Sequence, residues 1–353
     1  MQQTSMIVSR DTTSPAMTPG SFYDVGPDWT LVGVGAPAGQ YVSIVRDDGE
    51  LLCVYVRSAI PMDVCELAAK HYMAAGQTVT TNRGYAAGAK KRSQQHRTYA
   101  QGAAATSGIV GYLDSPNHKR PCRLSAFSRL HYDDYTGGLP FVEHVNECFK
   151  KYVPERFAKQ NAQVATTPNF RIKDTAFSTV TVNHNFRTAL HKDTGDFKEG
   201  FGNISVISSG VSGGHILLPE YKVAILLQTG DYLAMNVHEY HCNSPMSMVD
   251  DTSYRLSFVC YLRDKISNCD KINARLQGIT GDLQGKEWDT RRIFHDIFGD
   301  VLPDKVVGRG SWVMESDVYK LEYKNKRYIF WDKTTGTRVF NLMPAWEYVQ
   351  SLV

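Results

Sequence analysis

The chain has 353 residues, of which 42% are hydrophobic and 21% charged, and its formal net charge is +3. This is the composition of a globular protein; no apolar run is long enough to span a bilayer, so we expect no membrane partner. The net charge is too small to indicate a nucleic-acid-binding protein by itself. The seven cysteines show no metal-finger spacing, and we expect reduced thiols in an intracellular protein of the cytoplasm or nucleus.

The N-terminal part is predicted to hold a flexible lead, short strands and two helices. Residues 1–20 are rich in Ser, Thr and Pro and lack an apolar segment, which indicates a flexible lead and not a signal peptide. Three short strands are predicted within 29–58, with a hairpin turn at 47–49. Apolar residues at helical spacing predict helices over 61–75 and 140–153.

A long loop is predicted between these two helices. Residues 80–120 are rich in Gly, Ala, Ser and Gln and show no periodicity, which is typical of a functional or disordered loop. The loop carries a basic run, with cations at Lys90, Lys91, Arg92, His96 and Arg97. Such a run is either an ordinary solvated surface or a contact surface for an anionic partner.

The composition changes in the second half of the chain. Within 176–264, short β-rich runs alternate with Gly and Asp turns, which predicts an α+β protein with a sandwich, barrel or jelly-roll core. After this block, residues 265–353 form a separate C-terminal extension, with a helix near 287–298 and β-like segments around 311–341. We therefore expect a main domain over 21–264 and an extension packed on its core.

A metal-binding pattern lies at the start of the β-rich block. His191 and Asp193 are two residues apart, so an extended strand places both side chains on one face. Together with a distant histidine they form a set of two imidazoles and one carboxylate, which binds one face of Fe(II) and leaves three positions open. His238 and His241 are the candidates for the third ligand. They face opposite sides of an extended segment, and we favour His241.

A second His-x-Asp pair competes for the metal. His131 and Asp133 are also two apart, with His184 downstream. This pair lies before a turn-rich segment and has no strand to hold it rigidly. We therefore prefer the pair in the β-rich block, and expect its metal to be the catalytic centre.

Arg255 is the candidate anchor for an acidic co-substrate. It begins the apolar strand expected over 254–261, where a buried charge needs a partner. A guanidinium binds a carboxylate through two parallel hydrogen bonds, and Ser257 projects from the same face to donate to the same group. The alternative is an ion pair between Arg255 and an Asp or Glu of the protein.

The order His-x-Asp, His, Arg-x-Ser on a strand-rich block resembles the 2-oxoglutarate/Fe(II)-dependent dioxygenases, whose core is a double-stranded β-helix, or jelly roll. Further motifs are similar to the TET/J-binding-protein branch of these enzymes. They lie at 82–88 (NRGYAAG), 108–112 (GIVGY), 182–188 (VNHNFRT), 191–196 (HKDTGD), 213–214 (GG), 230–231 (GD) and 241–245 (HCNSP). The resemblance covers roughly residues 80–264, and it implies that 21–264 is a dioxygenase domain.

The resemblance implies an activity and its cofactors. We expect Fe(II), 2-oxoglutarate and O2, and hydroxylation of the 5-methyl group of 5-methylcytosine in DNA to 5-hydroxymethylcytosine or beyond. The base must be flipped out of the duplex to reach a buried metal. Two alternatives remain within the family: thymine as the substrate, and ascorbate-dependent transfer of a glyceryl group, as in algal relatives.

The resemblance also implies roles for further residues. Asn183 and Arg187 are expected to contact the co-substrate or the base, and Asn243 to orient His241. Asp196 is expected to accept a hydrogen bond from the exocyclic amine of cytosine, although a turn residue after a glycine is an equally good interpretation. Contacts with DNA are expected from the basic side chains of Arg83, Lys90, Lys91 and Arg92.

Two other classes of function remain open. One is a small-molecule or protein hydroxylase on the same jelly roll, which would not need the basic loop. The other is a non-catalytic nucleic-acid-binding module that has kept its metal site. A set of three ligands with its anchor favours the enzyme, and we expect a monomer that binds DNA.

Overall fold

The computed structural model of the chain describes residues 3–12, 16–89, 103–114, 122–269, 305–306, 312–324 and 327–340. These residues belong to two compact units, which are Met1–Tyr112 with Asp133–Ser267, and Leu113–Tyr132 with Asn268–Val353. The second unit begins close to the predicted extension, but it also takes in residues 113–132, which no sequence pattern indicated. The predicted helix near 287–298 lies outside the described residues.

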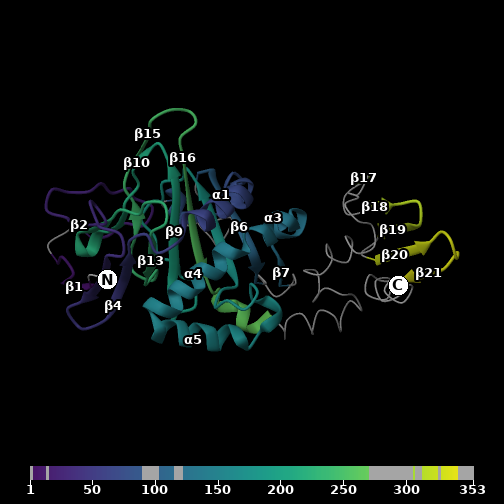
Figure 1. The fold of residues 1–353 in the computed structure, drawn as a ribbon, viewed down its shortest axis with the longest axis horizontal. Helices are drawn as coiled ribbons and strands as arrows, with labels where there is room; N and C mark the ends of the chain where they lie inside the picture. Colours follow the sequence, from purple (N-terminus) through teal and green to yellow (C-terminus); the bar gives the residue numbers. More distant parts are fainter. Residues whose placement is uncertain are drawn as a thin grey trace. The chain divides into compact units, whose positions relative to one another are not determined.

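A large sheet runs through the first unit, in the order β1-β3-β4-β13-β9-β16-β8-β6-β5 (Figure 1). In that order the strands are β1 (Gln3–Val8), β3 (Tyr41–Arg46), β4 (Leu51–Val56), β13 (Tyr232–Met235), β9 (Gly202–Ser209), β16 (Tyr254–Tyr261), β8 (Thr179–His184), β6 (Ala105–Leu113) and β5 (Val79–Thr80). From β4 to β6 all neighbours are antiparallel.

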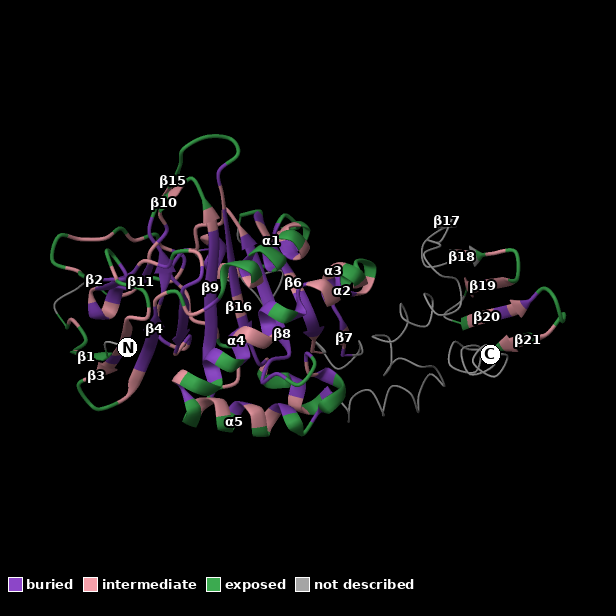
Figure 2. Ribbon diagram, in the orientation of Figure 1, coloured by how far each residue is buried: buried purple, intermediate pink, exposed green. Residues whose placement is uncertain are grey.

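A smaller sheet faces the large one. Its order is β14 (Cys242–Asn243), β11 (Ile216–Leu218), β12 (Val223–Ile225) and β2 (Thr30–Val32), and β10 (Val211–Gly213) pairs separately with β15 (Met246–Met248). One buried cluster joins Ile44, Val206 and Met235 of the large sheet to Leu218 and Ile225 of the small one. Figure 2 shows β9, β16 and β8 of the large sheet as mostly buried. Two mainly antiparallel sheets packed over a common core, with helices outside, confirm the predicted α+β class with a jelly-roll core.

Helices cover the face of the large sheet that lies away from the smaller sheet. They are α1 (Met62–Gly76), α4 (Leu139–Tyr152) and α5 (Pro154–Ala165), with the short α3 (Tyr132–Gly137) before α4. The Phe258 ring of β16 lies 4.8 Å from the Phe141 ring of α4 and 6.3 Å from the Tyr72 ring of α1, between centroids. Because side chains alternate along a strand, Arg255 and Ser257 project from the opposite face, toward the smaller sheet.

The strands and helices of the N-terminal part follow the sequence prediction closely. The hairpin turn is present between β3 and β4, with Gly49 in the left-handed region at φ 90°. The two predicted helices are confirmed as α1 and α4. The strands expected within 176–264 are confirmed as β8, β9, β11, β12, β13 and β16.

Two predictions for the N-terminal part are wrong. Residues 3–8 are not a flexible lead, because β1 pairs in parallel with β3 along its whole length. Residues 105–113 are not loop but the strand β6, which pairs with β8. Its small residues have a packing reason: a Cβ atom at Gly108 would overlap the carbonyl oxygen of Ala75 in α1.

The second unit contains an antiparallel sheet in the order β17 (Lys305–Val306), β18 (Trp312–Glu315), β19 (Tyr319–Lys324), β20 (Arg327–Asp332) and β21 (Arg338–Phe340). It also holds β7 (Arg123–Leu124), α2 (Ala126–Leu130) and a disulfide between Cys122 and Cys269, whose Cα atoms are 5.6 Å apart. The expectation that all thiols are reduced is therefore wrong for this pair. Among the described residues, no helix is long and apolar enough to cross a membrane.

Candidate active site

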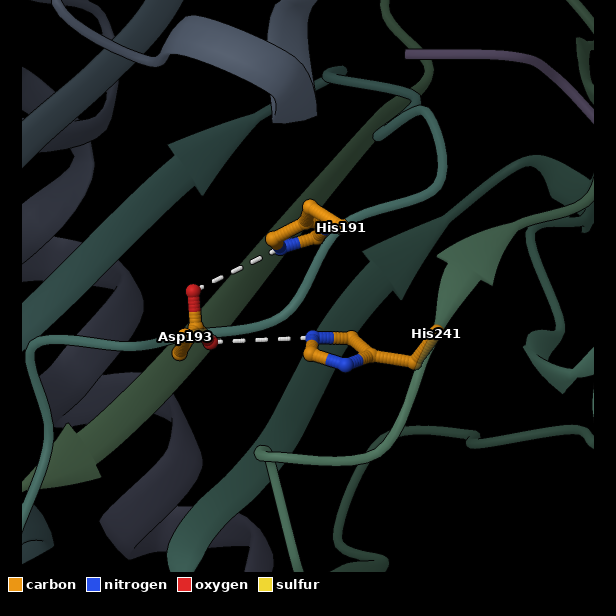
Figure 3. Close-up of side chains that lie close together, drawn as sticks. All are labelled: His191, Asp193 and His241. Atoms are coloured by element: carbon orange, nitrogen blue, oxygen red, sulfur yellow. Dashed lines mark ion pairs between the residues drawn. The ribbon is translucent and has the colours of Figure 1, made fainter. Parts of the chain in front are cut away.

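The three predicted metal ligands lie close together, with their side chains pointing toward one another (Figure 3). The Nε2 atoms of His191 and His241 are each 3.6 Å from a carboxylate oxygen of Asp193. One ligand atom from each residue lies within 4.8 Å of the others, and no other such group of His, Cys, Asp or Glu occurs among the described residues. The competing His131 ends α2 and stacks on Phe127 at 5.2 Å between ring centroids.

The chain brings the two histidines together through a backbone bridge. The amide of His191 donates to the carbonyl of His241 at 3.0 Å, and the amide of His241 donates back at 3.0 Å. Two residues on, the Asp193 amide donates to the Val237 carbonyl at 2.9 Å. The spacing within His-x-Asp then places both side chains of that segment on one face, as the sequence predicted.

Backbone carbonyls set the tautomer of both imidazoles. Nδ1 of His191 lies 2.8 Å from the Ala189 carbonyl, and Nδ1 of His241 lies 2.9 Å from the Glu239 carbonyl. A carbonyl only accepts, so each Nδ1 carries a proton, which leaves Nε2 as the atom of each ring that can bind a metal. Histidine ligands of metals are oriented in this way in proteins.

The electrostatics suit a cation between the three side chains. Burial and the neighbouring His241 lower the pKa of His191 to about 4, so its ring is neutral. Burial would raise the pKa of Asp193, but the two imidazoles lower it to about 2, so the carboxylate is ionised. Burial alone would lower the pKa of His241, but the hydrogen bond and the charge of Asp193 raise it. Two imidazole nitrogens and one carboxylate are the donor set of an Fe(II) site with open positions, and the side chains present therefore fit that metal.

The loop that presents His241 is held by a buried ion-pair cluster. The Glu239 carboxylate, 9% exposed, pairs with Arg10 at 2.9 Å and with Arg46 at 3.1 Å. Nε of Arg10 also donates to the Tyr221 hydroxyl at 3.0 Å. No sequence pattern indicated this cluster, because Glu239 is 229 residues from Arg10 and 193 residues from Arg46 along the chain.

The three candidate metal ligands open into a cavity of about 280 Å³ between the two sheets. Asp193 is the most exposed of the three, with 36% of its side chain accessible. Alternate residues of β16 line the cavity: Arg255, Ser257, Val259 and Tyr261. The alternation that predicted Arg255 and Ser257 on one face also applies to Val259 and Tyr261.

Arg255 is a buried cation without an acidic partner among the described residues. It is 4% exposed, and its Nη2 makes one long hydrogen bond, 3.3 Å, to the Gly214 carbonyl. Burial lowers the pKa of the Arg255 guanidinium to about 10. The alternative of an ion pair with a protein carboxylate is therefore not seen in the described part, and a bound anion would relieve the cost of burying this charge.

A row of hydrogen bonds crosses three strands beside the arginine. Nδ2 of Asn183 donates to the Ser257 hydroxyl at 3.3 Å, and the Ser107 hydroxyl donates to Oδ1 of Asn183. The three residues are register partners on β6, β8 and β16. Asn183 lines the cavity, as expected for a co-substrate contact, and it also holds Ser257 in place.

Arg83 and Asp196 lie on the metal side of the cavity. Burial lowers the pKa of Arg83, and its Nε is buried without a hydrogen-bond partner in the described part of the chain. Burial and the charge of Asp193 raise the pKa of Asp196 well above its usual range. Arg83 was expected on a DNA-binding loop, and the structure places it inside the cavity instead.

Two expected roles are corrected by the contacts. Arg187 is not among the residues lining the cavity: it donates to Asp24 at 2.7 Å and to the Tyr23 carbonyl at 2.9 Å, and so fixes the N-terminal segment. Asn243 lines the cavity but accepts from the Thr188 hydroxyl at 2.7 Å; the hydrogen bond that orients the ring of His241 comes from elsewhere, as described above. The expected DNA contacts at Lys90, Lys91 and Arg92 lie outside the described residues.

Comparison with known proteins agrees with this fold and site. Residues 107–264 match the Tet_JBP family, described as the oxygenase domain of the 2OGFeDO superfamily. The match covers less than half of the chain, and it confirms the resemblance that the motifs indicated. The superfamily uses Fe(II), 2-oxoglutarate and O2, so the predicted cofactor set is that of the family.

The chain is also similar to individual curated proteins. A protein of Trypanosoma cruzi named bifunctional helicase and thymine dioxygenase JBP2 is 32% identical over 222 residues, 62% of this chain and 19% of its own length. Thymine dioxygenase JBP1-B of the same organism is 37% identical over 168 residues, 46% of this chain and 20% of its own length. The chain thus spans about a fifth of these relatives.

A solved structure of NgTET1 in complex with 5mC DNA is also similar, with a TM-score of 0.44 and 12% sequence identity. The match covers 72% of this chain and 92% of that one.

Proposed function

We propose that the chain is an Fe(II)- and 2-oxoglutarate-dependent dioxygenase that hydroxylates the 5-methyl group of a pyrimidine base in DNA. One observation carries the proposal: a His-Asp-His ligand set opens into the same cavity as a buried arginine that has no acidic partner among the described residues. The first part suits Fe(II), and the second suits a dicarboxylate co-substrate.

The residues present have clear tasks in such a reaction. His191, Asp193 and His241 would hold the iron. When bound, iron together with O2 and 2-oxoglutarate supplies the oxidising power for inserting one oxygen atom into a C–H bond, while 2-oxoglutarate becomes succinate and CO2. Arg255 and Ser257 would bind the carboxylate of the co-substrate that lies away from the metal. The enclosing sheets keep bulk water out and hold the reactants in one orientation.

The contacts of Arg255 support 2-oxoglutarate over ascorbate. A guanidinium binds a carboxylate through two parallel hydrogen bonds, and 2-oxoglutarate carries a carboxylate at each end. Ascorbate carries none. If ascorbate were the co-substrate, the buried charge of Arg255 would therefore have no carboxylate to bind.

The place of the site supports base flipping. The ligands lie in a cavity between two sheets, and a base stacked in a duplex cannot bring its methyl group there. A small-molecule or protein hydroxylase has no such requirement. The names of the relatives, which are thymine dioxygenases, favour a base in DNA.

Thymine is the substrate that we propose, and 5-methylcytosine is the competitor that the sequence analysis favoured. The two bases differ at C4, where thymine carries an accepting oxygen and cytosine a donating amine. The cavity offers both kinds of partner: the Arg83 guanidinium only donates, whereas Asp196, whose pKa is raised, accepts when ionised and donates its O–H when protonated. The names of the relatives support thymine.

The test is a reaction of matched oligonucleotides that contain thymine, 5-methylcytosine or neither, followed by nucleoside mass spectrometry. Each is incubated with Fe(II) and O2, and with either 2-oxoglutarate or ascorbate. We expect thymine to gain one oxygen atom only with 2-oxoglutarate, and a His191→Ala protein to leave it unchanged. If only 5-methylcytosine gained oxygen, the substrate would be 5-methylcytosine and not thymine. If neither base changes mass, the assignment to DNA fails.

A further inference from the structure

The sheet β18–β21 of the second unit has two different faces. Leu321 and Phe330, register partners on β19 and β20, are fully buried and mark the core face. Lys320, Trp331 and Arg338 are register partners on β19, β20 and β21, one position away from that row. Alternation therefore places these three on the other face of the sheet, which we call the outer face.

Cations and aromatic rings interleave on the outer face. Nζ of Lys320 lies 5.2 Å from the centre of the Trp331 ring. Cζ of Arg338 lies 5.0 Å from the Trp331 ring and 5.0 Å from the Phe340 ring. Phe340 is 56% exposed. The outer face therefore presents to solvent the Arg338 guanidinium, which lies against two rings, and the exposed ring of Phe340.

A second pair of cations lies further along the same face. Lys324 and Arg327 are register partners at the end of β19 and β20, and both are exposed. Each is four residues from the Lys320–Trp331 row, which places this pair on the same face about 13 Å away.

The acidic groups of this face do not cancel the cations. Glu322, half-buried, lies between the two cation rows on the same face. Glu315, the register partner of Lys320, is paired with Lys333 at 2.8 Å. The described outer face therefore keeps an excess of positive charge around its aromatic rings.

We propose that the outer face of β18–β21 binds single-stranded nucleic acid. Lysine and arginine side chains would contact phosphates, and the exposed rings would stack on bases. A single strand fits better than a duplex, because rings standing on a sheet can stack only on bases that are not already stacked in a helix. This surface lies outside the metal cavity and goes beyond the proposed dioxygenase reaction.

An acidic peptide also matches the positive charge of the outer face. Its carboxylates do not use the faces of the aromatic rings, however, because they carry no ring to stack there and the negative face of a ring repels their charge. The nucleic acid is therefore the occupant that accounts for both features, and the peptide becomes an outcome of the test.

The experiment measures binding of a fluorescent oligo-dA to the full-length, metal-free protein by anisotropy at several salt concentrations. Oligo-dA contains neither thymine nor 5-methylcytosine, so the probe offers no substrate base to the metal cavity. In a K324Q/R327Q protein we expect weaker binding, with the slope of log K against log salt reduced by about 1.4, or about 0.7 for each phosphate contact. The matched control is Lys150→Gln, an exposed lysine of α4, which should change neither quantity.

A charge-neutral variant separates stacking from electrostatics. We expect Phe340→Leu to weaken oligo-dA binding about tenfold and to leave the salt slope unchanged. Circular dichroism of each variant checks that the sheet is intact. The proposal is overturned if both outer-face variants bind oligo-dA as the control does, if duplex DNA shows the same losses, or if polyglutamate of equal length displaces oligo-dA as well as unlabelled oligo-dA.

The test is independent of the catalytic proposal. A His191→Ala protein should bind oligo-dA as tightly as the unmodified protein, because the outer face contains no metal ligand. Failure of hydroxylation would therefore leave the binding result intact, and loss of oligo-dA binding would leave the metal site intact.

Discussion

His241 and His238 stand three residues apart in one loop, yet only one of them meets the metal cluster. Nε2 of His241 faces Asp193, whereas Nε2 of His238 is buried without a hydrogen-bond partner in the described part of the chain. The sequence favoured His241 but offered little reason for the choice. The reason is tertiary: the backbone bridge to His191 fixes the direction of His241.

The two histidines provide a matched pair of variants. We expect His241→Ala to lower the affinity for Fe(II), or for Co(II) as a stable substitute, by more than about 100-fold, because it removes a ligand and not only a supporting group. His238→Ala should bind the metal within about twofold of the unmodified protein. Equilibrium dialysis measures both, and equal losses in the two variants would contradict the assignment.

The proposed role of Arg255 also depends on its surroundings, because it is buried in the cavity without an acidic partner among the described residues. Arg255→Lys keeps the charge but loses the two parallel hydrogen bonds, at a cost of about 1.5–3 kcal/mol. We expect the KM for 2-oxoglutarate to rise about 10- to 150-fold, with a smaller change in kcat. Succinate formation measures both constants. Ser257→Ala should raise the same KM less, and an unchanged KM in the lysine variant would rule out the anchor.

At the scale of elements, the N-terminal strand has an unexpected task. β1 pairs with β3, and Arg46 at the end of β3 joins Arg10 in binding Glu239. The carbonyl of that glutamate orients the ring of His241. A segment that resembles a flexible lead in composition therefore supports a metal ligand more than 200 residues away.

This support is tested by Glu239→Gln, which removes the charge but keeps the backbone carbonyl. We expect metal affinity to fall about tenfold, as for other groups that orient a metal ligand. The free energy of unfolding should also fall, by about 1–3 kcal/mol, since two arginines lose a charged partner. Asp48→Asn is the control, because Asp48 pairs with the same Arg46 on the solvent side. A metal affinity that falls equally in both variants would argue against specific support.

At the scale of the whole molecule, the two units are built differently. The first is held by packing between its sheets and helices. The second is crosslinked between Cys122 and Cys269, which are 147 residues apart in sequence. Nothing in the cysteine spacing indicated this pair, because its partners meet only when 113–132 join the C-terminal extension.

Loss of the crosslink should destabilise the second unit. A disulfide that closes so long a loop contributes about 2–5 kcal/mol, largely by restricting the unfolded chain. We expect reduction by dithiothreitol, or a C122S/C269S protein, to lower the thermal midpoint of that unit. Dithiothreitol should have no further effect on the C122S/C269S protein. An unchanged midpoint on reduction would show that the bond contributes nothing to stability.

The sequence by itself determined the short-range features of this protein. Alternation and turn residues located the strands of the jelly roll, and spacing of two placed His191 beside Asp193 and Arg255 beside Ser257. These features depend on the geometry of one strand or helix, so neighbouring residues are enough to reveal them. The helices α1 and α4 were found for the same reason.

Only the tertiary structure decided which distant groups meet. It paired β1 with β3, turned a glycine-rich stretch into the buried strand β6, moved Arg83 into the cavity and took Arg187 out of it. Each result depends on contacts between residues far apart in the chain, and such contacts leave no period or spacing in a single sequence. The candidate ligand set was therefore readable from the sequence, while the cavity into which it opens had to be seen in the folded chain.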